Sequence, residues 1–98
     1  MPFEWDENKR HEVIAKHGVD ILYAALIFEG EILTRIDDRR DYGERRFISL
    51  GLVDGECFVV VHTARADATR LITAWKGGRD ERSSYEEGVA GRYPEAEG

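Results

Sequence analysis

The chain has 98 residues, 42% of them hydrophobic, and a formal net charge of −6, which suits one domain with a thin core and, taken alone, argues against a nucleic-acid binder. No apolar run reaches the ~20 residues of a membrane-spanning helix, and the first residues lack a secretion-signal pattern, so we expect a cytoplasmic protein without membrane contacts. The single cysteine, Cys57, excludes a disulfide framework and a cysteine-rich metal site.

The N-terminal third of the chain predicts two helices after a short stretch of extended chain. Residues 3–5 alternate apolar and polar side chains, which is compatible with a short edge strand. Asp6 is a suitable N-cap for a helix over residues 7–17, and Gly18 suits the position that ends it. This helix is polar, so we expect it on the surface with one narrow buried seam. Apolar residues at helical spacing predict a second helix over residues 21–28.

The hydrophobic period changes to two after residue 31, which predicts strands. The third predicted strand is apolar almost throughout, so we expect it in the middle of the sheet, covered on both faces. An Asp-Gly pair at residues 54–55 is typical of a tight hairpin turn before it. The four predicted strands cover residues 32–36, 46–52, 56–63 and 69–75.

The C-terminal part predicts one more helix and a tail. Residues 80–87 have a short, charged helical pattern after a Gly-Gly break. The Gly, Ala, Pro and Glu content of residues 89–98 predicts a flexible tail, which leaves one domain over residues 1–88. The order of two helices, an antiparallel meander of about four strands and a helix predicts an α+β fold with its helices on one side of the sheet.

The sequence lacks the motifs of the common metal and nucleotide enzymes. Its histidines, His11, His17 and His62, have no zinc-binding spacing, and no phosphate-binding glycine loop or nucleophile elbow occurs. We interpret Cys57 as a core residue rather than a nucleophile. No metal or other cofactor is implied.

The charges are distributed unevenly along the chain. Residues 32–82 carry ten basic side chains against nine acidic ones, and nine of the ten are arginine, whose planar guanidinium group suits phosphate. The segments before and after hold the acidic excess. A meander can bring basic residues at strand and helix ends onto one rim, among them Lys16, His17, Arg46, Arg65, Arg70 and Lys76.

Two interpretations of these basic residues remain open from the residues alone. A metal-free ribonuclease needs a base for the 2′-hydroxyl, an acid for the leaving oxygen and cations around the phosphate, and this set supplies them. Alternatively, Lys16 and His17 stabilise the C-terminal end of their helix, and the arginines form ordinary surface ion pairs.

Seven short stretches, in order over residues 3–87, resemble the BrnT family of toxins. The N-terminal ones are Phe3-x-Trp5-Asp6-x-x-Lys9, Lys16-His17-Gly18-Val19 and Ala24-Ala25-x-Ile27-Phe28. The others are Gly43-Glu44-x-Arg46, Val59-Val60-Val61-x-Thr63-x-Arg65, Arg70-Leu71-Ile72-x-Ala74 and Glu81-Arg82-x-x-Tyr85-Glu86.

The resemblance implies a RelE-like fold and a toxin that cleaves RNA and so inhibits translation. It also implies neutralisation by a BrnA-type ribbon-helix-helix antitoxin, in a dimeric or heterotetrameric complex that contacts operator DNA through the antitoxin. The family's charged pattern is matched here by Lys16, His17, Arg46, Arg65, Arg70 and Glu81, to which we assign catalytic roles. We assign RNA contacts to Trp75, Lys76, Arg79 and Arg82.

The sequence departs from the family pattern at one position that bears on activity. Thr73-Ala74-Trp75 stands where Ser-Ala-Arg is typical of the family, so Trp75 replaces a cation. A tryptophan can stack on an RNA base, or it can be a packing residue, and Lys76 restores part of the charge. The alternative to an active toxin is therefore a catalytically weakened homologue that acts with its antitoxin as a co-repressor.

Overall fold

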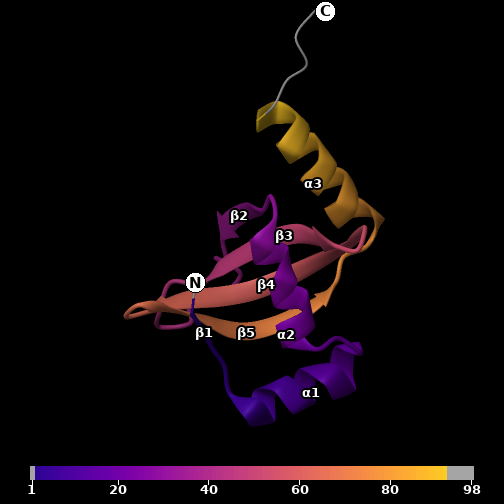
Figure 1. Ribbon diagram of the computed structural model, residues 1–98. Helices are drawn as coiled ribbons and strands as arrows, with labels where there is room; N and C mark the ends of the chain where they lie inside the picture. Colours follow the sequence, from indigo (N-terminus) through magenta and orange to yellow (C-terminus); the bar gives the residue numbers. More distant parts are fainter. Residues whose placement is uncertain (1, 93–98) are drawn as a thin grey trace, which may run out of the picture.

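A computed structural model describes residues 2–92 as a five-stranded sheet with helices on both faces (Figure 1). The order along the chain is β1 (Phe3–Glu4), α1 (Glu7–His17), α2 (Ile21–Ala24), the 3₁₀ helix η1 (Ala25–Glu29), β2 (Leu33–Ile36), β3 (Phe47–Val53), β4 (Glu56–Arg65), β5 (Ala68–Lys76) and α3 (Arg79–Arg92). The strand order in the sheet is β1-β5-β4-β3-β2. None of the helices in this part of the chain has the length and hydropathy needed to cross a membrane.

α1 begins and ends at the residues that the sequence predicted. The Asp6 carboxylate accepts hydrogen bonds from the backbone N–H groups of Asn8 and Lys9, and Gly18 adopts a left-handed conformation with a φ of 69°. Val13 is the only buried residue of this helix. The prediction of a surface helix with a narrow buried seam is therefore confirmed.

Asp20 joins α1 to the next helix. Its carboxylate accepts two hydrogen bonds from the Arg10 guanidinium group, at 2.9 and 2.7 Å, and a third from the backbone N–H of Leu22 at the start of α2. These bonds lower the pKa of Asp20, the Arg10 bonds contributing most. One side chain thus caps α2 and fixes the orientation of α1.

The second predicted helix divides into α2 and the tighter η1. In η1, Ile27 is fully buried and lies directly against Gly51 of β3. A β-carbon added at Gly51 would lie 2.5 Å from the Ile27 Cβ, so the missing side chain is what allows η1 to approach the sheet. Sequence periodicity did not indicate this change of helix type.

The predicted meander is confirmed, and the short N-terminal strand is present. β2, β3, β4 and β5 pair antiparallel in sequence order, and Asp54 and Gly55 form the turn before β4 with φ values of 50° and 80°. β1 pairs with β5 in parallel, which makes the sheet mixed. Residues 57–61 of β4 are all buried, as their apolar run predicted.

A β-bulge in β5 decides where Trp75 points. His62 pairs with Leu71 and Val61 pairs with Thr73, so Ile72 is an extra residue in the strand. Regular alternation would place Leu71 and Trp75 on the same face of the sheet. With the bulge, Leu71 joins the core under the N-terminal helices, while Trp75 packs with Ile48 and Val59 on the opposite face.

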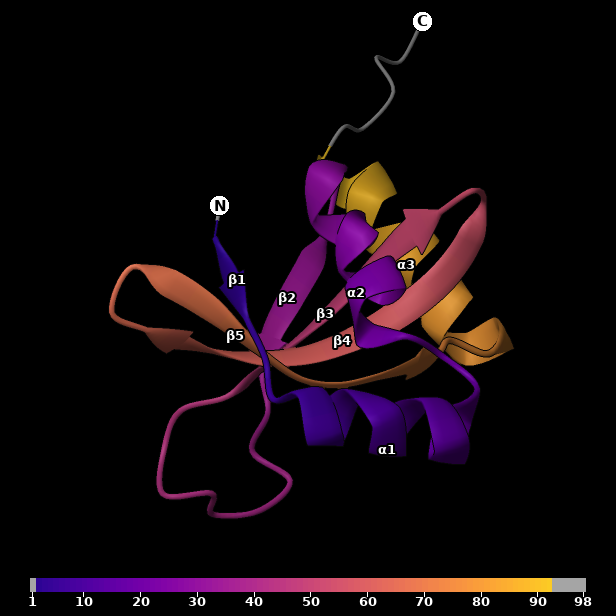
Figure 2. The same ribbon diagram turned by 60° about the horizontal axis from the view of Figure 1, so that its bottom comes forward.

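α3 lies on that opposite face, which corrects the prediction that all helices share one side. Figure 2 shows α2 and α3 on different sides of the sheet. Gly88 of α3 lies against the Leu33 side chain, which shares a face with Leu50 and Val59 through the strand pairing. Because the central strand β4 is apolar on both faces, the second face of the sheet must also be shielded from solvent, and α3 covers part of it.

α3 is longer than the sequence predicted, because two side chains fasten it to the segment before β2. The Tyr85 hydroxyl donates to the Glu31 carbonyl oxygen at 2.9 Å, and Arg92 forms an ion pair with the Glu31 carboxylate at 2.5 Å. Residues 89–92, assigned from the sequence to the flexible tail, are therefore helical. The rest of that predicted tail, residues 93–98, lies outside the described residues.

Candidate nucleic-acid interface

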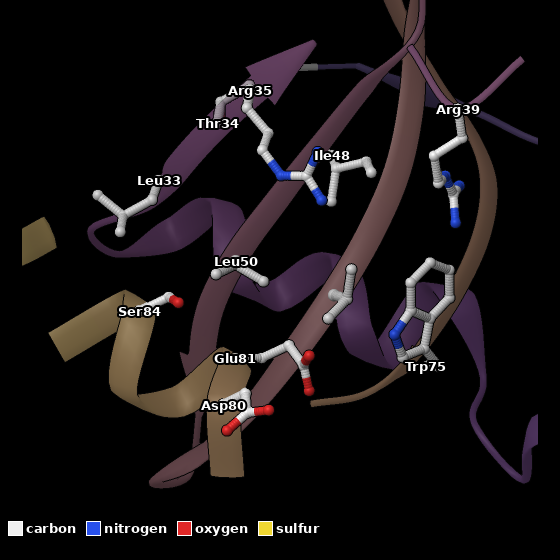
Figure 3. A pocket seen from close by; sticks show the side chains of 11 residues that line it. Leu33, Thr34, Arg35, Arg39, Ile48, Leu50, Trp75, Asp80, Glu81 and Ser84 are labelled. Carbon is white, nitrogen blue, oxygen red and sulfur yellow. The ribbon is translucent and has the colours of Figure 1, made fainter. Parts of the chain in front are cut away.

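Trp75 separates two neighbouring cavities at the β5 side of the sheet. One is an open groove of about 960 Å³ between α1, β5 and the loop of residues 37–46. The other is a smaller cavity of about 370 Å³ on the sheet face that α3 partly covers (Figure 3). Trp75 and Arg39 line both of them, so the two cavities form one continuous surface.

The groove is strongly basic although the whole chain is acidic. One acidic side chain, Glu12, lines it. The remaining polar lining consists of five cations, a histidine and a threonine: Lys9, Lys16, Arg39, Arg40, Lys76, His17 and Thr73. The imidazole ring of His17 lies 6.1 Å from the Trp75 ring, measured between centroids. The groove therefore combines positive charge, an aromatic face and an imidazole.

Most of the basic side chains elsewhere are neutralised by a carboxylate. Among residues 2–92, eight of the fourteen lysine and arginine side chains form ion pairs. Of the six that do not, Lys9, Lys16 and Arg40 line the groove and Arg35 lines the adjoining cavity. The other two are Arg45 and Arg79. Three of the five cations in the groove thus have no ion-pair partner among residues 2–92, which leaves positive charge available to a polyanion.

Arg39 is fixed in place by a buried carboxylate. The Asp37 side chain is 0% exposed and accepts hydrogen bonds from Nε and Nη2 of Arg39 at 2.7 and 2.8 Å. These bonds hold the pKa of Asp37 well below its usual range, against the opposing effect of burial. The Arg39 guanidinium carbon lies 5.6 Å above the Trp75 ring centroid, a cation–π arrangement. Arg39 remains half-exposed, so its charge is still available to a ligand.

The same aspartate anchors the loop that forms one side of the groove. The Asp37 backbone N–H donates to the Arg46 carbonyl oxygen at 2.8 Å, which closes the loop at its base. The Arg46 guanidinium group stacks over the Tyr42 ring at 4.2 Å and pairs with Glu44 at 3.0 Å. These contacts fix the loop of residues 37–46 in place, whereas its sequence indicated only a polar loop.

The smaller cavity has an apolar floor and charged rims. Ile48, Leu50 and Val59 form its floor, and Leu33 and Thr34 also line it. Figure 3 shows Arg35 and Glu81 reaching over this floor from opposite sides, with Asp80 beside Glu81 and Arg39 above Trp75. Oε1 of Glu81 accepts a hydrogen bond from the Gly78 backbone N–H at 2.5 Å, while Asp80 has no hydrogen-bond or ion-pair partner among residues 2–92.

The structure brings together some of the residues to which the sequence analysis assigned a role, and it separates others. Lys16, His17, Trp75 and Lys76 share the groove, and Glu81 faces Trp75 in the adjoining cavity. Lys76 is also paired with Glu56 at 2.5 Å. The other residues with an assigned role lie outside both cavities. Arg46 and Arg65 lie beside Glu44, and Arg70 is paired with Glu4. Arg79 and Arg82 lie near the β3–β4 turn.

Sequence reasoning missed four cations of the site. Lys9 belonged to a motif of the resemblance but received no role, and Arg35, Arg39 and Arg40 were counted only in the charge balance. The adjacent pair Arg39 and Arg40 in a polar loop was the available signal. Nothing in the sequence indicated that this loop lies against β5 rather than in solvent.

A separate chain of polar side chains runs across the sheet from β2 through β3 to β4. Thr34 Oγ1 lies 2.7 Å from Ser49 Oγ, which lies 2.8 Å from Nε2 of His62. The His62 ring is packed between Phe28 and Phe47, and burial lowers its pKa. Ser49, the middle member of this chain, is fully buried, so a substrate cannot reach it.

The fold and the groove define a class: a small α+β domain in which cations without an ion-pair partner among residues 2–92 gather around a half-buried aromatic ring. Residues 5–81 match the family model described as the ribonuclease toxin BrnT of type II toxin-antitoxin systems. The chain therefore belongs to the BrnT family. The match spans α1, the strands from β2 to β5 and the first residues of α3, and so includes every residue that lines the groove and all but Ser84 of those that line the smaller cavity. No curated relative matches the chain at a significant level. The RelE-like fold stays a prediction.

Proposed function

We propose that this chain is an endoribonuclease toxin that binds single-stranded RNA in the basic groove and cleaves it without a metal ion, thereby inhibiting translation. The observation that carries the proposal is the gathering of Lys9, Lys16 and Arg40 around the half-buried ring of Trp75 in a chain of net charge −6, none of the three having an ion-pair partner among residues 2–92. RNA supplies a repeated phosphate charge and flat bases, which are the two chemistries that this groove accepts.

Each part of the groove has a role in such a reaction. Lys9, Lys16 and Arg40 would hold the phosphates, and Arg39 would stabilise the charge that develops on the scissile phosphate. The His17 imidazole lies beside Trp75 and would move the proton of the 2′-hydroxyl or of the leaving oxygen. Five cations in one groove disfavour the binding of a divalent metal, which supports a metal-independent mechanism.

We also propose that a BrnA-type ribbon-helix-helix antitoxin neutralises the chain by covering this groove. Family membership implies an antitoxin partner, and an open cationic groove is complementary to an acidic segment. Antitoxins of this type pair through their own DNA-binding regions, so the complex would be dimeric or heterotetrameric and would contact operator DNA through the antitoxin.

RNA cleavage by the purified chain in excess EDTA tests the enzymatic proposal. We expect the native chain to cut single-stranded RNA, and the Lys16→Ala/Arg40→Ala variant to lose at least tenfold in rate because two phosphate contacts are removed. Arg45→Ala is the matched control, since Arg45 is also exposed and unpaired but lies outside the groove. No cleavage by the native chain, or equal cleavage by all three proteins, would refute the proposal.

A second candidate function is a weakened toxin that acts with its antitoxin as a co-repressor. Trp75, which stands where the family pattern typically has arginine, favours it, because an aromatic ring cannot neutralise a phosphate. This function predicts that Trp75→Arg cleaves RNA while the native chain does not. It also predicts that operator DNA is bound more tightly by both proteins together than by the antitoxin alone, which a gel-shift titration measures.

A further inference from the structure

We infer that the smaller cavity beside Trp75 binds one unpaired guanine base, with the carboxylates of Asp80 and Glu81 as the groups that select it. This inference rests on the proposed ribonuclease function and adds a base preference to it. It makes Asp80 and Glu81 specificity-determining residues, distinct from the cations that hold the phosphates.

The cavity has the size and surface for one flat ring system. Its volume of about 370 Å³ lies at the lower end of the range for small-molecule pockets. The floor of Ile48, Leu50 and Val59 is apolar, and the Trp75 ring stands at its edge. Unstacked bases are typically held in this manner, on apolar or aromatic side chains that cover the ring faces.

The cavity is also in the right place relative to the groove. Trp75 and Arg39 line both, so a strand whose phosphates follow Lys16 and Arg40 passes directly beside the cavity. A base that turns away from the groove at Trp75 would enter the cavity while its phosphate stays near Arg39. No chain segment among the described residues fills this space.

The charged rims fit guanine in particular. Guanine presents two adjacent donors, N1–H and the N2 amino group, on one edge and two acceptors, O6 and N7, on the next edge. Carboxylates accept the first pair, and an arginine side chain donates to the second. Asp80 and Glu81 lie on one rim of the cavity and Arg35 on the opposite rim, and neither Asp80 nor Arg35 has an ion-pair partner among residues 2–92.

The other three bases leave a carboxylate facing an acceptor. Adenine and cytosine place a ring nitrogen acceptor beside their amino group, and uracil places its single N–H between two carbonyl oxygens. A carboxylate opposite such an acceptor loses a hydrogen bond and meets like partial charge. We therefore expect discrimination rather than general base binding.

Binding of uncleavable RNA tests the inference. The probes are 2′-O-methyl hexanucleotides, either all uridine or uridine with one central guanosine, adenosine or cytidine, each with a 5′ fluorophore. Anisotropy titration of the native chain should give about tenfold tighter binding of the guanosine probe than of the other three. In Asp80→Asn/Glu81→Gln the guanosine preference should disappear, while the affinity for the all-uridine probe is kept or increased.

Glu87→Gln is the matched control, because it removes a negative charge from the same helix at a residue that lines neither cavity. It should retain the full guanosine preference. The inference is overturned if the native chain binds all four probes equally, or if the preference survives in Asp80→Asn/Glu81→Gln. Either result leaves the ribonuclease proposal standing when unmodified RNA is still cut; a chain that binds no probe and cuts no RNA refutes both.

Discussion

Arg39 shows how one buried residue prepares an exposed one for binding. An arginine on a surface loop samples many rotamers, and ordering them on binding costs free energy. The Asp37 carboxylate, which solvent does not reach, restrains Arg39 in advance and holds it over Trp75. We therefore propose that Asp37 acts as a positioning residue, although it lines neither cavity.

Asp37→Asn should weaken RNA binding without removing any cation. An amide cannot accept both guanidinium hydrogen bonds as a carboxylate does, so Arg39 is released from Trp75. We expect lower affinity for the all-uridine hexanucleotide and a loss of roughly 1–3 kcal/mol in the free energy of unfolding. Anisotropy and urea denaturation measure the two effects. Asp38→Asn, at an exposed residue without a partner, should change neither; an unchanged affinity in Asp37→Asn would refute the positioning role.

His62 makes the stability depend on pH in a predictable direction. Burial lowers its pKa, so the unfolded chain binds the proton more strongly than the folded one. The contribution of His62 is therefore complete above the ordinary histidine pKa of about 6.5 and falls as the pH drops from there towards its lower folded pKa. In the tautomer whose Nε2 accepts from the Ser49 hydroxyl, protonation also removes this acceptor.

His62→Gln isolates this effect, because it keeps polar groups near Ser49 but cannot titrate. Urea denaturation of both proteins from pH 7.5 to pH 5 gives the free energy of unfolding at each pH. The native chain should lose more stability over this range than His62→Gln, while groups common to both proteins cancel in the difference. Parallel pH profiles would show that the His62 pKa does not differ between the folded and unfolded states.

Among the secondary-structure elements, those with local signals were predictable and those set by tertiary contacts were not. Asp6 and Gly18 marked the bounds of α1, and Asp54-Gly55 marked a hairpin, because capping and turn chemistry act within a few residues. The bulge at Ile72 depends on the pairing with β4 and has no such local signature. It decides which face Trp75 occupies, and so the candidate site was predictable only in part.

The approach of η1 to the sheet gives an element-scale test at Gly51. A β-carbon there would meet the Ile27 side chain at 2.5 Å, so Gly51→Ala should destabilise the fold by about 1–3 kcal/mol through overpacking. Gly91→Ala is the matched control, because nothing lies within 4 Å of its added β-carbon and alanine favours the helical conformation. Urea denaturation should show a loss for the first and no loss for the second; equal stability would mean that η1 moves aside freely.

At the scale of the whole molecule, the distribution of ion pairs explains how a chain of net negative charge can present a basic groove. The net charge of −6, taken alone, argues against a nucleic-acid ligand. Ion pairs occupy Arg46, Arg65 and Arg70 away from the groove, and these were the arginines that motif spacing favoured. Among residues 2–92, most of the cations without an ion pair lie in the groove or in the adjoining cavity. Only the three-dimensional arrangement reveals this separation of paired from unpaired cations.

The gathering of unpaired cations in the groove predicts how RNA binding depends on the salt concentration. For a single strand, the slope of log K against log salt concentration is about −0.7 for each phosphate neutralised. If Lys9, Lys16, Arg39 and Arg40 each contact one phosphate, the all-uridine hexanucleotide should show a slope of about −2.8 between 50 and 200 mM salt, and Lys16→Ala/Arg40→Ala about −1.4. Arg45→Ala should keep the native slope, because its charge lies outside the groove. A native slope near zero, or one reduced equally by Arg45→Ala, would mean that the RNA is not held by these cations.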